Sequence, residues 1–208
     1  MSGCAPLVLA SSASKAETPS SGYARAMTET HAAVRVGGAP SGATSAATGL
    51  PVLDHLIGEL AAAGRLRVTL EVAPSTAGAE AVAAGQALGR ELATLLAADG
   101  AARRGWAIVP ADEALAAAAL EVTDAPLLAA NVDFSDERVA GVSTDVASRF
   151  LEALAQTASL SLHVRLLEGR DPQHVLVAIF KAVGAALGEA VRTPEAVRIP
   201  ETGTKGDA

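Results

Sequence analysis

The stretch from residue 53 to residue 72, LDHLIGELAAAGRLRVTLEV, joins a helix pattern to a strand pattern. Apolar residues at positions 53, 56, 57 and 60 recur at the spacing of one helix face. Residues 66–72 then alternate between apolar and polar side chains, as a half-buried strand does. The stretch therefore predicts a short helix followed directly by a strand.

The same pattern returns later in the chain. Residues 148–166, SRFLEALAQTASLSLHVRL, again run from a helix pattern into an alternating strand. Each unit continues into a longer predicted helix, at about 77–97 and 173–191, in which Ala87-Leu88-Gly89 matches Ala182-Val183-Gly184. Two such copies predict two similar halves packed face to face. Chance similarity in an alanine-rich chain is the alternative, and the repeat alone leaves it open.

The segment between the repeats is predicted to be extended. Residues 105–110 have a strand pattern, and residues 114–120 have helix propensity but precede an expected turn at 121–124 and another apolar stretch at 127–134. We therefore expect a strand at 114–120. The adjacent Asp112 and Glu113 would then point to opposite faces of a strand, which argues against an acid–base pair. Gly184 and Gly188 inside the last helix indicate close helix packing.

Composition limits the possible functions. The 208 residues are 50% hydrophobic but only 2% aromatic, so the core is built from small aliphatic side chains. A net charge of -7 argues against nucleic acid or an anionic membrane as a partner. The single cysteine, Cys4, excludes an internal disulfide, and residues 1–10 lack the features of a signal peptide. These features predict a cytoplasmic protein. We expect tails at 1–22 and 193–208 around a body at 23–192, with halves of about 23–100 and 101–192.

Several short motifs, in order, resemble one known family. Their order and spacing over about Tyr23–Gly206 are similar to those of imidazoleglycerol-phosphate dehydratases. The motifs are Thr28-Glu29-Thr30, Thr48-Gly49-Leu50 with Leu53-Asp54-His55, Arg104-Gly105 with Pro110–Ala116, Ser143-Thr144-Asp145, Leu162-His163, Phe180-Lys181-Ala182 and Thr204-Lys205-Gly206.

The resemblance implies a fold, an assembly and a reaction. The expected fold is α+β, with duplicated half-domains that each carry two helices on one face of a four-stranded sheet, as in the ribosomal protein S5 domain 2-like fold. Family members form hollow shells of 24 subunits and dehydrate imidazole glycerol phosphate in histidine biosynthesis. Two manganese ions between subunits bind the imidazole ring and stabilise the anion left when it loses its proton.

The family's metal ligands are mostly missing from this sequence. They come from two His-His-x-x-Glu motifs on the long helices and one histidine on each short helix. Two of the eight ligand positions, His55 and His174, keep a residue that can bind a metal. At another position stands Arg149, whose positive charge repels a divalent cation. The changed positions are Gly78, Ala79 and Val82 on the first long helix, Gln173 and Val177 on the second, and Arg149 on the second short helix.

The other family positions are better preserved. Arg104, Lys181 and Lys205 occupy places that the family uses near the substrate phosphate, and Glu29 resembles a catalytic residue near the substrate. The alternative is that Arg104 and Lys181 are ordinary solvated cations and that Glu29 is an exposed strand carboxylate. The family's second phosphate arginine is replaced here by Ala125. His31 and His163 are interpreted as structural or solvent-facing strand residues.

Three functional hypotheses remain open. The first is a metal-deficient relative with little or no dehydratase activity that binds a phosphorylated imidazole compound. For it we expect no cofactor, with manganese only if the altered site can hold it. The second is a working dehydratase with an altered metal site, and the third is a non-catalytic assembly subunit that joins an intact paralogue. A homo-oligomer smaller than the family's shell, such as a trimer, is expected.

Overall fold

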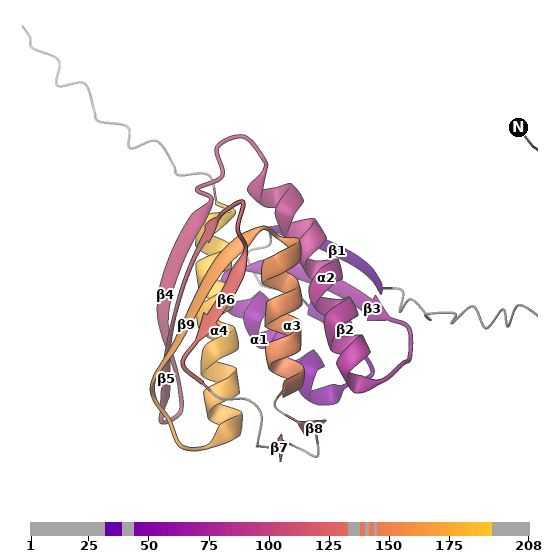
Figure 1. The fold of residues 1–208 in the computed structure, drawn as a ribbon, viewed down its shortest axis with the longest axis vertical. Coiled ribbons are helices and arrows are strands. Elements are labelled where there is room, and N and C mark those ends of the chain that lie inside the picture. Colours follow the sequence, from indigo (N-terminus) through magenta and orange to yellow (C-terminus); the bar gives the residue numbers. More distant parts are fainter. Residues whose placement is uncertain (1–31, 39–43, 133–137, 140–141, 144, 193–208) are drawn as a thin grey trace, which may run out of the picture.

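The computed structural model describes residues 32–38, 44–132, 138–139, 142–143 and 145–192. Four helices and nine strands lie within these residues (Figure 1). In chain order they are β1 (Ala32–Gly38), β2 (Thr44–Ala47), α1 (Pro51–Gly64), β3 (Leu66–Val72), α2 (Ala77–Leu96), β4 (Arg104–Ala111), β5 (Ala114–Val122), β6 (Leu127–Ala130), β7 (Arg138–Val139), β8 (Val142–Ser143), α3 (Asp145–Thr157), β9 (Leu160–Glu168) and α4 (Pro172–Ala190).

The two halves share one topology. In the first half, β3 is central, antiparallel to β1 and parallel to β2. In the second half, β9 is central, antiparallel to β5 and parallel to β6, and β4 adds a fourth strand beside β5. The described residues of the first half contribute three strands to their sheet. The predicted duplication and the α+β class are confirmed.

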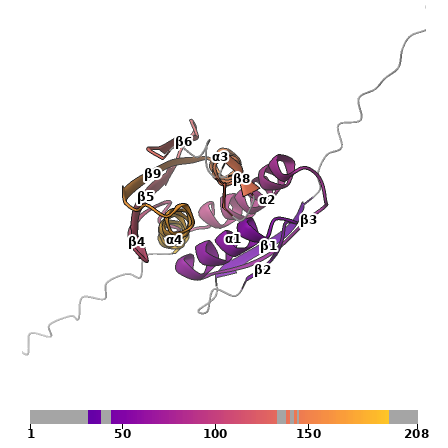
Figure 2. The same cartoon turned by 90° about the horizontal axis from the view of Figure 1, so that it is seen from below.

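The helices lie between the two sheets (Figure 2). Helices α1 and α2 cover the sheet of the first half, and α3 and α4 cover the sheet of the second half. Across the middle, α1 packs against α4 and α2 against α3. Phe150 on α3 and Phe180 on α4 stack at the centre with ring centroids 5.6 Å apart. The core is therefore a helical layer closed on both sides by sheets.

Strand β5 shows why an alanine-rich segment is extended here. Residues 114–122 form this strand, as predicted, despite the helix propensity of alanine. Its buried positions alternate, and the buried side chains rest on α4. Tertiary packing therefore outweighs local propensity, because a strand here pairs on both edges, with β4 and β9.

Glycines let the helix backbones approach closely. A Cβ atom on Gly184 of α4 would collide with the carbonyl oxygen of Leu60 on α1, and one on Gly188 would collide with that of Gly64. In the other helix pair, Gly89 of α2 lies against Leu154 and Thr157 of α3. Gly89 and Gly184 thus hold equivalent places in the two halves, which supports the matched Ala87-Leu88-Gly89 and Ala182-Val183-Gly184 segments. The predicted close packing at residues 184–188 is confirmed.

Helix α4 is the one described helix long and apolar enough to cross a membrane by length and composition. Within its apolar window, 61% of the residues are buried inside the protein. Such burial is typical of a core helix, and it agrees with the central position of α4 between α1 and its own sheet.

We predict that Gly184→Ala destabilises the protein by roughly 2 kcal/mol or more, because the added methyl overlaps the Leu60 carbonyl. Gly58→Ala on α1 is the matched control, since a Cβ there meets nothing within 4 Å. It should be neutral or stabilising by up to about 1 kcal/mol through helix propensity. Urea unfolding of both variants checks this, and equal effects would contradict the close approach of α1 and α4.

Candidate functional site

The N-terminal ends of α1 and α4 line a small hollow of about 220 Å³. His55 is the one basic side chain among its lining residues, and Gln173 and Val177 face it from α4. The remaining lining residues are Pro51, Val52, Leu56 and Leu176. The structure thus brings together three of the family's ligand positions, but only His55 carries an imidazole. Around it the hollow is mostly apolar.

His174 is held by two carboxylates at the β4–β5 turn. Its Nδ1 is 2.5 Å from Glu113 Oε2, and its Nε2 is 3.6 Å from Asp112 Oδ2. The expectation that Asp112 and Glu113 point to opposite faces of a strand is therefore wrong. They form the turn itself, where Asp112 has a positive φ of 50°, and both reach the same histidine.

Glu113 also secures the loop that leads into α4. It accepts hydrogen bonds from the backbone N–H groups of Asp171 (2.9 Å) and Arg170 (3.4 Å). Asp171 in turn caps α4 by accepting from the N–H groups of Gln173 and His174. The hydrogen bonds from Asp171 and His174 lower the pKa of Glu113 to about 2, and the hydrogen bond to Glu113 raises the pKa of His174. The pair of His174 and Glu113 therefore ties the β4–β5 turn to the start of α4.

The second cluster of family positions lies where α2 meets α3. The side chain of Arg149 packs over Gly78, with its Nε 3.8 Å from the place a Cβ would take. The guanidinium also pairs with Asp145 one helical turn earlier, at 3.0 Å. A cation therefore stands at a position where the family places a metal ligand, and it faces a residue without a side chain.

The neighbouring carboxylate does not replace the lost ligands. Glu80 is buried, and its Oε1 accepts a hydrogen bond of 2.7 Å from the backbone N–H of Ser75. The same carboxylate lies against Gly49 in the turn before α1. Glu80 thus joins the start of α2 to the start of α1, which is a structural role.

Within one copy of the described chain, the candidate donors do not come together as a manganese site. Within the part of the chain that the structure describes, no three histidine, cysteine, aspartate or glutamate side chains gather as a metal ion would require. Zinc and similar ions are held by three or four such side chains. His55 faces mostly apolar neighbours, and His174 is paired with Glu113. At the third position, Arg149 carries a positive charge and cannot act as a metal ligand.

The two described residues that were expected near phosphate, Arg104 and Lys181, do not converge within one chain. Lys181 pairs with Glu59 of α1 at 3.3 Å. Arg104 begins β4 beside Glu189, near the opposite end of α4 from His174, a distance of roughly 22 Å along a helix rising 1.5 Å per residue. Glu29 and Lys205 lie outside the described residues.

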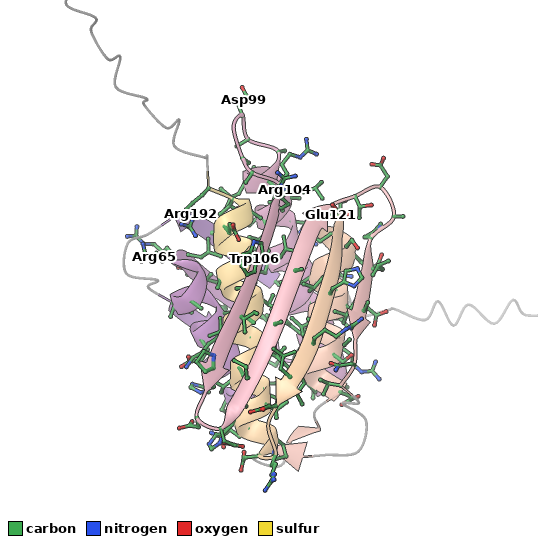
Figure 3. All side chains as sticks on the ribbon, turned by 90° about the vertical axis from the view of Figure 1, so that its left-hand side faces the viewer. Arg65, Asp99, Arg104, Trp106, Glu121 and Arg192 are labelled. Carbon is green, nitrogen blue, oxygen red and sulfur yellow. The ribbon has the colours of Figure 1, made fainter. Side chains whose placement is uncertain are left out.

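Arg104 belongs to a second, larger hollow of about 680 Å³ on the outer face of the second sheet (Figure 3). Trp106, Glu121 and His163 also line it, and Trp106 is 67% exposed. Motif comparison did not identify this site. The alternation of Arg104, Trp106 and Ile108 along one strand could have found it, because it places a tryptophan on the exposed face.

The tie between His174 and Glu113 predicts a pH-dependent stability. Glu113, with a depressed folded pKa, stabilises the fold above pH 4.5 and loses this effect as the pH falls towards 2. His174, with a raised folded pKa, stabilises it below pH 6.5 and loses this effect as the pH rises through that folded pKa. The stability difference between wild type and His174→Gln should therefore be largest between pH 4.5 and 6.5, as measured by thermal unfolding.

His163→Gln is the control for this experiment, since His163 is an exposed histidine whose partner is the hydroxyl of Ser161. Its difference from wild type should show no such maximum. A flat profile for His174→Gln would contradict the tie.

Comparison with known proteins agrees with this fold. The sequence profile described as imidazoleglycerol-phosphate dehydratase matches residues 48–187. An imidazoleglycerol-phosphate dehydratase from Moorella thermoacetica is 34% identical over 186 residues, which cover 86% of this chain and 93% of that protein. One from Corynebacterium urealyticum is 38% identical over 174 residues, covering 78% and 84%.

Solved structures give the same result. The crystal structure of the Staphylococcus aureus enzyme superposes with a TM-score of 0.71 at 26% identity and covers 78% of this chain and 94% of that one. The Pyrococcus furiosus enzyme in complex with (S)-C348 gives a TM-score of 0.70 at 25% identity, covering 84% and 94%. Because both the sequence match and the fold extend over most of the chain, this protein belongs to the imidazoleglycerol-phosphate dehydratase family.

Proposed function

We propose that this chain serves histidine biosynthesis as an imidazoleglycerol-phosphate dehydratase-like protein and that its ligand is a phosphorylated imidazole compound. The observation that carries the proposal is the likeness to dehydratases along nearly the whole length of the relatives. That likeness favours a lyase acting on imidazole glycerol phosphate, through a site that differs from the one the family's metal ligands would build.

The donor set of this chain favours a second candidate, a relative with little or no dehydratase activity. Arg149 over Gly78 places a permanent positive charge at one expected metal position. At the other, Val177 and Gln173 leave His55 without an anionic companion. A divalent ion would meet repulsion at the first position and one imidazole at the second. For this reason we derive no catalytic step that passes through a metal.

Arg104 and His55 have side chains that suit the binding of a phosphorylated imidazole compound. Arg104 offers a guanidinium that can hold a phosphate by two parallel hydrogen bonds. His55 offers an imidazole at the mouth of the apolar hollow between α1 and α4. Since these two groups lie near opposite ends of the helical layer, binding one ligand with both requires residues from neighbouring copies. We therefore propose a cytoplasmic homo-oligomer as the working form.

A metal and activity measurement separates the two candidates. The purified chain is analysed for manganese content and assayed for dehydration of imidazole glycerol phosphate with and without added manganese. A working dehydratase should retain manganese and turn over substrate. A metal-deficient relative should retain none and bind the substrate without turnover. Failure to bind any imidazole phosphate would contradict both and would favour an assembly subunit.

Restoring the family's residues gives a gain-of-function prediction. The double substitution Gln173→His with Val177→Glu completes a His-His-x-x-Glu motif around His174 and places new donors opposite His55. We expect this variant to retain more manganese after dialysis than the wild type. Val177→Gln with Gln173 unchanged is the control, because it adds a polar side chain without charge. Manganese retained by the wild type to the same extent as by the double variant would contradict the metal-deficient interpretation.

A further inference from the structure

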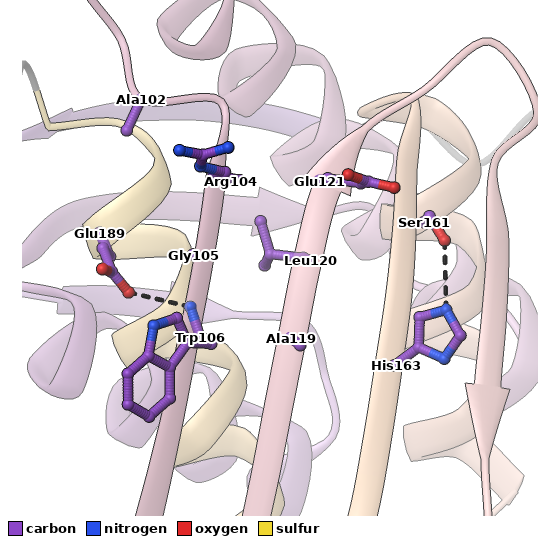
Figure 4. A pocket seen from close by; sticks show the side chains of 10 residues that line it. All are labelled: Ala102, Arg104, Gly105, Trp106, Ala119, Leu120, Glu121, Ser161, His163 and Glu189. Atoms are coloured by element: carbon purple, nitrogen blue, oxygen red, sulfur yellow. Dashed lines mark hydrogen bonds between the residues drawn. The ribbon is translucent and has the colours of Figure 1, made fainter.

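The outer face of the second sheet carries an apolar ridge beside an apolar groove (Figure 4). The ridge is formed on β4 by Trp106 and Ile108, which are 67% and 55% exposed. The groove lies on β5, where strand pairing places Ala119 beside Trp106 and Ala117 beside Ile108. The larger hollow described above crosses this groove at Ala119 and reaches His163 on β9. A raised row and a low row of the same length therefore lie side by side.

The fold itself does not require an apolar outer face. The first sheet has the same topology, and its outward side chains include the charged Arg35 on β1 and Glu71 on β3, both exposed. Arg35 pairs with Thr69 on the central strand β3, as Ala119 pairs with His163 on the central strand β9. Equivalent places thus hold an arginine in one half and an alanine in the other. Because a solvated sheet face ordinarily carries polar side chains, the ridge and groove indicate a contact surface.

The edge of the second sheet is less suited to a partner than its face. Strand β4 is an edge strand, and the backbone N–H groups of residues 106, 108 and 110 point away from β5. The N–H of Trp106 already donates a hydrogen bond of 2.9 Å to Glu189, and Pro110 has no N–H to donate. An added strand would therefore find one free donor, on Ile108, among these three positions.

We propose that the ridge and groove dock a second copy of this chain as a symmetric pair, an inference that rests on the proposed homo-oligomer. A two-fold axis that runs along the strands, midway between β4 and β5, lays β4 of each copy over β5 of the other. Trp106 then rests on Ala119 of the other copy, and Ile108 rests on Ala117. Each ridge fills the facing groove, as a self-complementary interface requires. Two aligned sheets pack about 10 Å apart, which leaves room for these side chains.

The charges on this face agree with a second copy as the partner. A chain with a net charge of -7 repels its own copy except where the facing surfaces are uncharged or complementary. The ridge and groove are uncharged. The same axis brings β9 of one copy beyond the edge of β4 of the other, so that the imidazole of His163 comes opposite the carboxylate of Glu189. Arg104 and Glu121 occupy the row at one end of the face and form part of a polar rim.

A charge placed in the groove tests this pairing. Ala117→Lys should raise the dissociation constant of the pair by about a hundredfold, because each contact would bury two ammonium groups without partners. Ile108→Lys places the same charge on the ridge and should act alike. Ala33→Lys is the matched control, since Ala33 pairs with Glu71 on the first sheet as Ala117 pairs with Arg165 on the second. Circular dichroism confirms that all three variants remain folded.

Two measurements on the full-length protein report the result. Light scattering after size exclusion gives the molar mass over a range of concentrations. The fluorescence of Trp106, the single tryptophan of the chain, reports whether the ridge is covered. We expect Ala117→Lys and Ile108→Lys to have a lower molar mass than the wild type at equal concentration, with emission at longer wavelength. Ala33→Lys should match the wild type in both measurements.

The outcomes separate this surface from the proposed homo-oligomer. If the wild type assembles and Ala117→Lys and Ile108→Lys keep its molar mass and emission, the copies meet through another face, so the docking surface is wrong and the homo-oligomer stands. If the wild type is a monomer at submillimolar concentration, both are wrong. An emission that stays the same when the assembly dissociates would also overturn the docking surface. The manganese and turnover measurements decide the dehydratase-like function independently of all three results.

Discussion

The close contact of helix backbones across the middle of the molecule is the constraint on which the rest depends. Gly184 and Gly188 allow α4 to lie against α1, and Gly89 does the same for α2 against α3. With a side chain at these places the helices would separate, and the two sheets would no longer share one core. Among the described residues, Phe150 and Phe180 are the only buried aromatic side chains, so the helical layer is packed mainly from aliphatic side chains. The alanine-rich helices suit this close packing.

The same helix contacts position the family's metal-ligand places. Parallel packing of α1 and α4 sets His55 opposite Gln173 and Val177, and packing of α2 and α3 sets Arg149 over Gly78. The fold thus brings side chains of two helices together at two places that differ in chemistry. The place around His55 is mostly apolar, and the place at Gly78 carries the guanidinium of Arg149.

Much of this arrangement could be predicted from the sequence. The period of apolar residues located α1, α3, β3 and β9, and the repeated Ala-x-Gly segments located the helix contacts. That residues 78–82 hold no histidine can also be seen from the sequence alone. The role of His174 could not be predicted, because Glu113 lies 61 residues away in sequence and meets it only through the β4–β5 turn. Likewise, nothing in the sequence shows that Arg104 and His55 stand at opposite ends of the helical layer.

The outward position of Trp106 follows from a similarly close contact between backbones. Its neighbour Gly105 faces inward, where a Cβ would collide with the carbonyl oxygen of Ala186, so β4 rests almost directly on the α4 backbone. An indole cannot be accommodated at such a contact, and on this strand a large ring can only point outward. The outward face then combines a ring, an unpaired arginine and an unpaired glutamate on adjacent strands. A surface selected only for solubility would favour a charged side chain at position 106, because an exposed tryptophan invites association. The exposed indole of Trp106 is therefore better explained by contact with another molecule than by the demands of the core.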